Sequence, residues 1–85
     1  MARVIGKYWK CDELTVNLQI KTNQQQENIE KALPGWMCVS YGYIPKTMED
    51  LYIFQRRFES ELDWAKFLNS EKTTDLIEMK EVQNG

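Results

Sequence analysis

Histidine is missing from the 85 residues of this chain. Its absence excludes nucleophiles activated in a Ser-His-Asp or Cys-His arrangement, and it removes the most common general base and the most common metal ligand. The four glycines stand singly, so the sequence contains no glycine-rich phosphate loop. We therefore predict a protein that is not an enzyme and that has no catalytic residues.

Cysteine occurs only twice, at Cys11 and Cys38, without a C-x-x-C spacing. A structural zinc site needs four nitrogen or sulfur ligands, which two thiols in a chain without histidine cannot supply. A disulfide is disfavoured because nothing in the sequence indicates secretion. We interpret both cysteines as small buried hydrophobic side chains, and we expect neither a metal nor a cofactor.

Long apolar runs and an excess of basic residues are also missing. The first ten residues, MARVIGKYWK, do not have the apolar core of a signal peptide, and no stretch approaches the roughly 18 apolar residues of a membrane span. The formal net charge is −2, whereas duplex-binding proteins carry an excess of Lys and Arg that displaces counterions from phosphates. We expect a cytoplasmic protein with no membrane partner, and nucleic acid is the less favoured partner.

Hydrophobic residues make up 42% of the chain and include three Trp, four Tyr and three Phe. This composition is typical of a packed domain and argues against disorder. The length allows one hydrophobic core, so we predict a single small domain over residues 1–85.

Alternation of apolar and polar residues predicts the strands. The clearest pattern is LTVNLQI at 14–20, where Leu and Val alternate with Thr, Asn and Gln. Residues 3–11 are rich in β-branched and aromatic side chains and can add an earlier strand, joined through a turn at Asp12 and Glu13. Further strands are predicted at 36–44, 51–58 and 73–82.

Two helices fit between these strands. The first is predicted to be capped by Asn23 and to end at Pro34, because proline cannot continue a helix. The second is predicted to begin after Ser60, whose hydroxyl can accept a hydrogen bond from a free backbone N–H of the first turn. Its apolar stripe, which should face the core, consists of Trp64, Phe67 and Leu68.

The predicted order from residue 14 onward is β-α-β-β-α-β. This order resembles the ferredoxin-like superfold, which implies an α+β fold of two layers, with two helices on one face of an antiparallel sheet. A strand at residues 3–11 requires a different strand order, because both sides of the superfold's first strand are already occupied. The alternative is two successive β-β-α units, at roughly 1–32 and 36–69.

The segment YIFQRRF at 52–58 has three interpretations: a platform for stacking bases, a buried core strand, or an aromatic patch that faces a protein partner. Alternation places Tyr52, Phe54, Arg56 and Phe58 on one face of a strand. On a helix-free face these side chains would form a platform for stacking bases, as in RNA-binding sheets. Beneath the helices the rings would form core, each removing about 150–250 Å² from water. We favour the core, because LTVNLQI offers no ring to such a platform.

The remaining strand aromatics suggest a surface for a protein partner. If several of them lie on the helix-free face, the apolar patch exceeds what monomers usually expose. We predict a non-catalytic protein-binding module, a small inhibitor, adaptor or subunit, that docks on a partner or on another copy through sheet aromatics or an edge strand. The alternative is a single-stranded nucleic-acid-binding domain that uses Tyr52, Phe54, Arg56 and Phe58. The predicted partner-binding residues are Tyr8, Trp9, Trp36, Tyr41, Tyr43 and Arg57.

Overall fold

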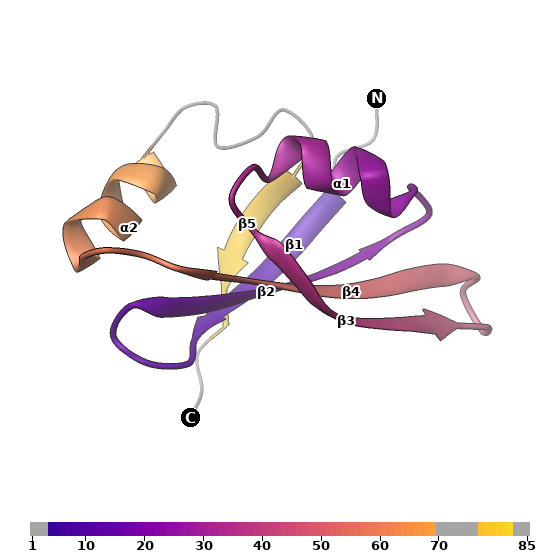
Figure 1. The fold of residues 1–85 in the computed structure, drawn as a ribbon. Coiled ribbons are helices and arrows are strands. Elements are labelled where there is room, and N and C mark those ends of the chain that lie inside the picture. Colours follow the sequence, from indigo (N-terminus) through magenta and orange to yellow (C-terminus); the bar gives the residue numbers. More distant parts are fainter. Residues whose placement is uncertain (1–3, 70–76, 83–85) are drawn as a thin grey trace.

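The computed structural model describes residues 4–69 and 77–82, which form a five-stranded sheet with two helices above one face (Figure 1). The spatial order of the strands is β3-β4-β2-β1-β5. The elements are β1 (Val4–Lys10), β2 (Thr15–Thr22), α1 (Gln26–Ala32), β3 (Met37–Ile44), β4 (Glu49–Arg57), α2 (Glu61–Asn69) and β5 (Ile77–Glu81).

The fold is α+β as predicted, but the sheet is mixed and the ferredoxin-like order is not matched. β1 pairs with β2 in an antiparallel hairpin and with β5 in parallel, so β1 lies between these two strands. The short connection from β1 to β2 explains the difference, because it places β1 directly beside β2 and leaves β5 only the outer position. β4 pairs antiparallel with β2 and with β3, which gives this part of the sheet the order of the superfold.

The first hairpin closes through Asp12, in the predicted turn. Its Oδ1 accepts hydrogen bonds from the backbone N–H groups of Leu14 (2.9 Å) and Thr15 (2.8 Å). These two bonds hold the carboxylate form and lower the pKa of Asp12 below its ordinary value. A short Asp side chain that bonds its own backbone two or three residues ahead is a turn-forming device, so no glycine is needed here.

The core lies between the sheet and the helices. Val16, Leu18 and Ile20 of β2 are buried, which confirms the alternation predicted for LTVNLQI. Their partners from the helix layer are Ile29 of α1, Leu33 just after it, and Trp64 of α2. In the predicted stripe of α2, Trp64 is buried and Phe67 packs partly buried against the core. The prediction for Leu68 is wrong, because this side chain is exposed near the end of the helix.

Of the two predicted helix caps, the one at Ser60 is confirmed and the one at Asn23 is wrong. Ser60 caps α2 as expected, since its Oγ accepts a hydrogen bond from the backbone N–H of Asp63 at 3.2 Å. The prediction for α1 is wrong, because the capping position is Gln25, which makes no side-chain cap bond. Thr22 accounts for the shift: its Oγ1 accepts a hydrogen bond from the N–H of Gln24, which forms a turn between β2 and the helix.

Gly6 permits the close contact between β1 and its neighbours. It faces the core at the register position of Ile20 on β2 and Met79 on β5. A Cβ atom at Gly6 would lie 2.8 Å from Leu18 Cδ1 and 3.2 Å from Ile77 Cγ2. Side chains from the two flanking strands therefore fill the space above this residue, and a larger residue has no room.

Candidate functional site

Two of the six residues predicted to bind a partner belong to the core. Tyr8 and Trp36 are 8% and 7% exposed. The Tyr8 ring packs edge-on against Trp64 with centroids 5.0 Å apart, and the Trp36 ring packs against Phe58 at 6.0 Å. Burial in the helix layer removes Tyr8 and Trp36 from the predicted binding surface.

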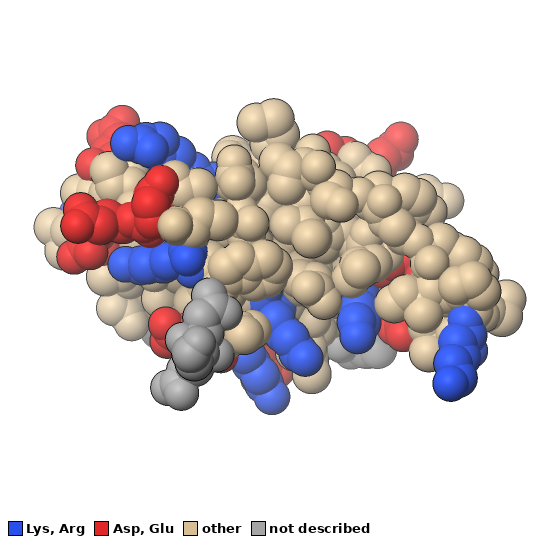
Figure 2. Space-filling view, turned by 90° about the horizontal axis from the view of Figure 1, so that it is seen from below, with Lys and Arg blue, Asp and Glu red and all other residues tan. Residues whose placement is uncertain are grey.

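Trp9 and Arg57 do lie on the helix-free side. Trp9 is half-buried opposite Asn17, and Arg57 is exposed opposite Thr15. This face is seen from below in Figure 2, where uncharged side chains cover most of the surface and Lys and Arg side chains gather along the lower border. Trp9 is the one aromatic side chain that the described strands place on this face, so the predicted aromatic patch is absent there.

The segment YIFQRRF lies with its rings beneath the helices. Tyr52, Phe54 and Phe58 are 3%, 0% and 4% exposed, so they have no free face on which a base could stack. The guanidinium of Arg56 lies 4.5 Å from the centre of the Phe58 ring, a cation–π contact on the core side of the sheet. The three rings of the predicted nucleic-acid set are therefore buried, whereas Arg56 is half-buried.

Exposed apolar side chains concentrate instead on β3, at one edge of the sheet. Of the eight exposed large hydrophobic residues in the described part of the chain, four belong to this strand and Met48 follows in the next turn. The strand sequence, MCVSYGYI, contains no charged residue and no proline. The four exposed side chains are Met37 (65%), Val39 (47%), Tyr41 (59%) and Tyr43 (52%).

The outer side of β3 has no strand beside it in the described structure, because β4 is its one neighbour in the sheet. The β3–β4 hairpin also extends past the end of α1, so the helix layer does not cover its tip (Figure 1). A register shift between Cys38 and Ser40 divides the strand, and the pairing with β4 is regular from Ser40 to Ile44. In the described structure, the outer backbone groups of residues 40–44 therefore have no strand partner, and Tyr41 and Tyr43 lie within this segment.

Tyr41 is held in place by two contacts. Its hydroxyl donates a hydrogen bond to Asp50 Oδ1 at 2.8 Å, and its ring centre lies 5.3 Å from that of Tyr52. The hydrogen bond to the carboxylate raises the pKa of Tyr41, because ionisation would remove the donated proton. Tyr52 in turn contacts Phe54, with centroids 6.1 Å apart. A row of rings thus connects the exposed edge with the core.

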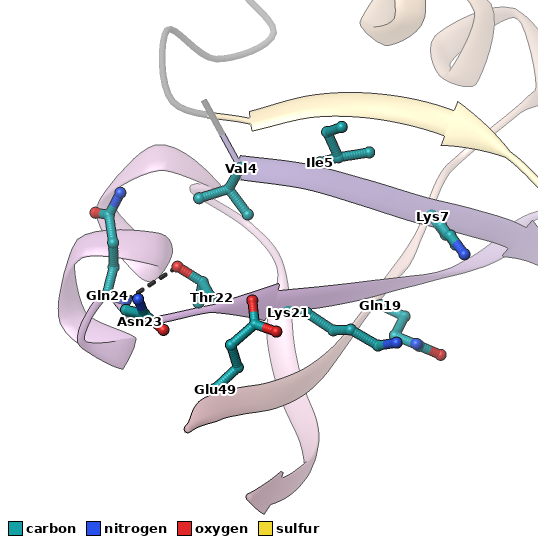
Figure 3. A pocket seen from close by; sticks show the side chains of 9 residues that line it. All are labelled: Val4, Ile5, Lys7, Gln19, Lys21, Thr22, Asn23, Gln24 and Glu49. Atoms are coloured by element: carbon teal, nitrogen blue, oxygen red, sulfur yellow. Dashed lines mark hydrogen bonds between the residues drawn. The ribbon is translucent and has the colours of Figure 1, made fainter. Parts of the chain in front are cut away.

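A shallow hollow of about 500 Å³ opens near the start of β1 (Figure 3). Val4 and Ile5 give it an apolar lining, while Lys7, Lys21 and Glu49 supply charges and the residues after β2 supply amides. The described residues contain no group of three Cys, Asp or Glu side chains that could hold a metal ion. The hollow thus combines an apolar wall with separate charged and amide side chains.

The two cysteines are not the fully buried hydrophobic side chains that we predicted. Both are free, Cys38 is half-buried, and Cys11 is exposed. The prediction for Cys11 is wrong because this residue lies in the turn that follows β1, outside the reach of the core. The Cys38 thiol donates a hydrogen bond to the backbone carbonyl of Ser40 at 3.4 Å, across the irregular point of β3.

Sequence reasoning missed Met37 and Val39 as surface residues, although a signal was present. An eight-residue strand without Lys, Glu or Pro can be a central strand or an unprotected edge, and only the strand order separates these cases.

The two helices of the described residues, α1 and α2, are too short and too polar to cross a membrane. Comparisons of the chain with family models, with curated proteins and with solved structures found no match.

Proposed function

We propose that this chain is a non-catalytic protein-binding module whose docking element is the outer edge of β3. The observation that carries the proposal is an eight-residue edge strand that contains no charge and has four exposed large hydrophobic side chains. Natural sheets usually protect such an edge with Lys, Pro, a covering segment or a very short strand. An edge strand without this protection can pair with a strand of a partner protein.

The mode of binding follows from the geometry of the edge. Unpaired N–H and C=O groups of an edge strand form a ladder with any extended segment, which supplies affinity without sequence preference. Tyr41 and Tyr43 lie at alternate positions on the same face and supply side-chain contacts. Because tyrosine buries a large area and loses little conformational freedom, such rings are common anchors in protein interfaces.

The chemistry of the edge also indicates the class of partner. A strand without charge cannot recognise phosphates or an acidic peptide through ion pairs, so the matching ligand is an uncharged, extended protein segment. Such a module would act as a small inhibitor, adaptor or subunit by occupying or extending a sheet of the partner.

Site-specific photo-crosslinking tests the proposal. A photoreactive amino acid at Ser40, which is exposed on β3, should give protein adducts in the cells of origin. The matched control is the same amino acid at Glu78, which is exposed on β5 at the opposite edge of the sheet. Adding Tyr43→Lys to the Ser40 variant should reduce the adducts. Equal adducts from both positions, or none from position 40, would refute the proposal.

A further inference from the structure

We infer that the strand that docks on β3 is β3 of a second copy of this chain, paired antiparallel about a two-fold axis at Gly42. This inference rests on the function proposed above and names the partner. Two five-stranded sheets would join into one continuous sheet of ten strands. The argument depends on the symmetry of the strand, on the space around Gly42 and on the charges of the edge.

The three central residues of the regular part of the edge form a symmetric sequence. The pairing of β3 with β4 is regular from Ser40 to Ile44, which reads SYGYI, and its centre is the palindrome Tyr41-Gly42-Tyr43. In a two-fold interface the same residues meet in both directions, so a strand pairs well with itself when its sequence is symmetric about the axis. With Gly42 on the axis, Tyr41 lies opposite Tyr43 of the partner subunit, and Tyr43 lies opposite the partner's Tyr41.

This register keeps all four tyrosines on one face. Tyr41 and Tyr43 share the face of Tyr52 and Asp50, their partners on β4. Directly opposite residues of an antiparallel pair have Cβ atoms about 4.5–5.5 Å apart. The existing contact between Tyr41 and Tyr52 would therefore continue across the interface to Tyr43 of the partner subunit. The two rings on each chain, now 59% and 52% exposed, would cover one another.

Gly42 leaves the axis free of steric conflict. It faces the helix-free side of the sheet, and no other heavy atom lies within 4 Å of the place where a Cβ would stand. Glycine against glycine at the axis lets the two backbones approach without a side-chain clash. The same open space means that a small side chain can be introduced there without disturbing the fold.

The charges of the edge are compatible with self-pairing. Because β3 is uncharged, a second copy brings no like charge directly opposite another, which is the usual device against edge-to-edge association. The net charge of −2 on each chain adds only a weak long-range repulsion. The paired segment is short, so the contact falls below the roughly 1,200 Å² of stable interfaces, and we expect a weak, concentration-dependent dimer.

Cysteine crosslinking tests the register directly. The variant Gly42→Cys is made in a chain that also carries Cys11→Ser and Cys38→Ser, so that it has one thiol. Oxidation should convert it into a disulfide-linked dimer, because position 42 faces its own copy across the axis. The matched control is Ser40→Cys, which should not link to itself: the two thiols would lie about 13 Å apart along the strand, at about 3.3 Å per residue.

A mixture of two variants gives a second reading of the same register. Ser40→Cys and Ile44→Cys, in the same thiol-free background, should link to one another and not to themselves, because position 40 lies opposite position 44 of the partner. A monomeric Gly42→Cys chain at high concentration, or equal self-linking of Ser40→Cys and Gly42→Cys, would overturn the inference.

The outcomes also separate this inference from the function on which it rests. If Gly42→Cys stays monomeric while photo-crosslinking from Ser40 captures a different protein, the docking edge is correct and the second copy is wrong. If position 40 yields no protein adduct and Gly42→Cys stays monomeric, both proposals are wrong. Sedimentation of the unmodified chain adds an independent measurement, with dimer expected to increase with concentration.

Discussion

The two edges of this sheet differ in length, charge and exposure. β3 has eight residues without a charge, whereas β5 has five, IEMKE, of which three are charged. β5 also runs parallel to its neighbour β1, while β3 runs antiparallel to β4. A new strand at β5 would have to desolvate Glu78 or Lys80, which is costly without a partner charge.

This difference shows that edge protection is not uniform within one small sheet. Charged residues on β5 are the ordinary defence of an edge strand. Among the described residues, the one such feature on β3 is the irregularity between Cys38 and Ser40, which leaves the rest of the strand regular. The bare edge also belongs to the hairpin whose other strand, β4, is anchored by buried rings. The structure thus places an unprotected edge strand, β3, next to a strand whose rings are buried in the core.

The largest expected change in the free energy of unfolding comes from a substitution in the core next to β3, the uncharged edge strand. Phe54 is fully buried, opposite Leu18 on β2 and Cys38 on β3. Phe54→Ala should lower the free energy of unfolding by about 3–5 kcal/mol, the cost of removing a buried ring. Urea unfolding measures the change. Met37→Ala, at an exposed position of β3, is the control and should change stability by about 0.5 kcal/mol or less. Equal effects of the two substitutions would contradict the core assignment.

A smaller loss of stability is expected from a substitution that displaces β5, the edge strand with charged residues. Gly6→Val places a branched side chain where Leu18 and Ile77 already approach the backbone. We expect a loss of about 1–3 kcal/mol, as for other overpacked cores. Because Gly6 contacts β5 and not β3, amide exchange should rise in residues 77–81 and stay unchanged in residues 40–44. Equal acceleration at both edges would show that they are not independent.

A still smaller change in stability, with a clear change in association, is expected from charging the bare edge. Tyr43→Lys should leave the free energy of unfolding within about 0.5 kcal/mol, because the side chain is exposed. It should weaken self-association about tenfold or more, because the contact loses the Tyr43 ring and the ammonium group at this position would lose hydration. Analytical ultracentrifugation compares Tyr43→Lys with the control Met48→Lys, whose substitution lies in the adjacent turn. Equal weakening by Met48→Lys would exclude β3 as the contact.

The smallest effect concerns the ionisation of Tyr41. Its pKa is raised by the hydrogen bond to Asp50, so this bond contributes stability below the ordinary tyrosine pKa of about 10, and the contribution is lost as pH rises through the raised value. Asp50→Ala should return the pKa of Tyr41 towards its ordinary value, and Asp50→Asn should do so in part because the amide oxygen remains an acceptor. An NMR titration of the tyrosine ring carbons follows this change. An unchanged pKa in Asp50→Ala would contradict the assignment.

Local features of this fold were predictable from the sequence. The alternation in LTVNLQI predicts β2 because a two-residue period fits a sheet with one buried face. The cap at Ser60 was predictable because it needs only a hydroxyl three residues before a free N–H. Asn23 failed as a cap because Thr22 competed for the same stretch of backbone. Where two local hydrogen-bonding solutions exist, the sequence does not decide between them.

Strand order and the position of the edge were beyond local reasoning. β1 and β5 lie far apart in the sequence, and no residue pattern encodes their parallel pairing. For the same reason the sequence could not show that Tyr41 and Tyr43 lie at an edge while Tyr8 and Trp36 lie in the core. The orientation of Tyr52, Phe54 and Phe58 was predictable, since three rings bury more area than the alternative face.

Amide hydrogen exchange at two protein concentrations tests the central claim most directly, because the protected edge serves as the internal reference. The outward-facing backbone amides of residues 40–44 should exchange more slowly at the highest attainable concentration than at high dilution, as a second strand covers the outer side of β3. The amides of residues 77–81 should exchange at the same rate in both samples. Exchange in residues 40–44 that does not depend on concentration, or equal slowing at both edges, would contradict the account.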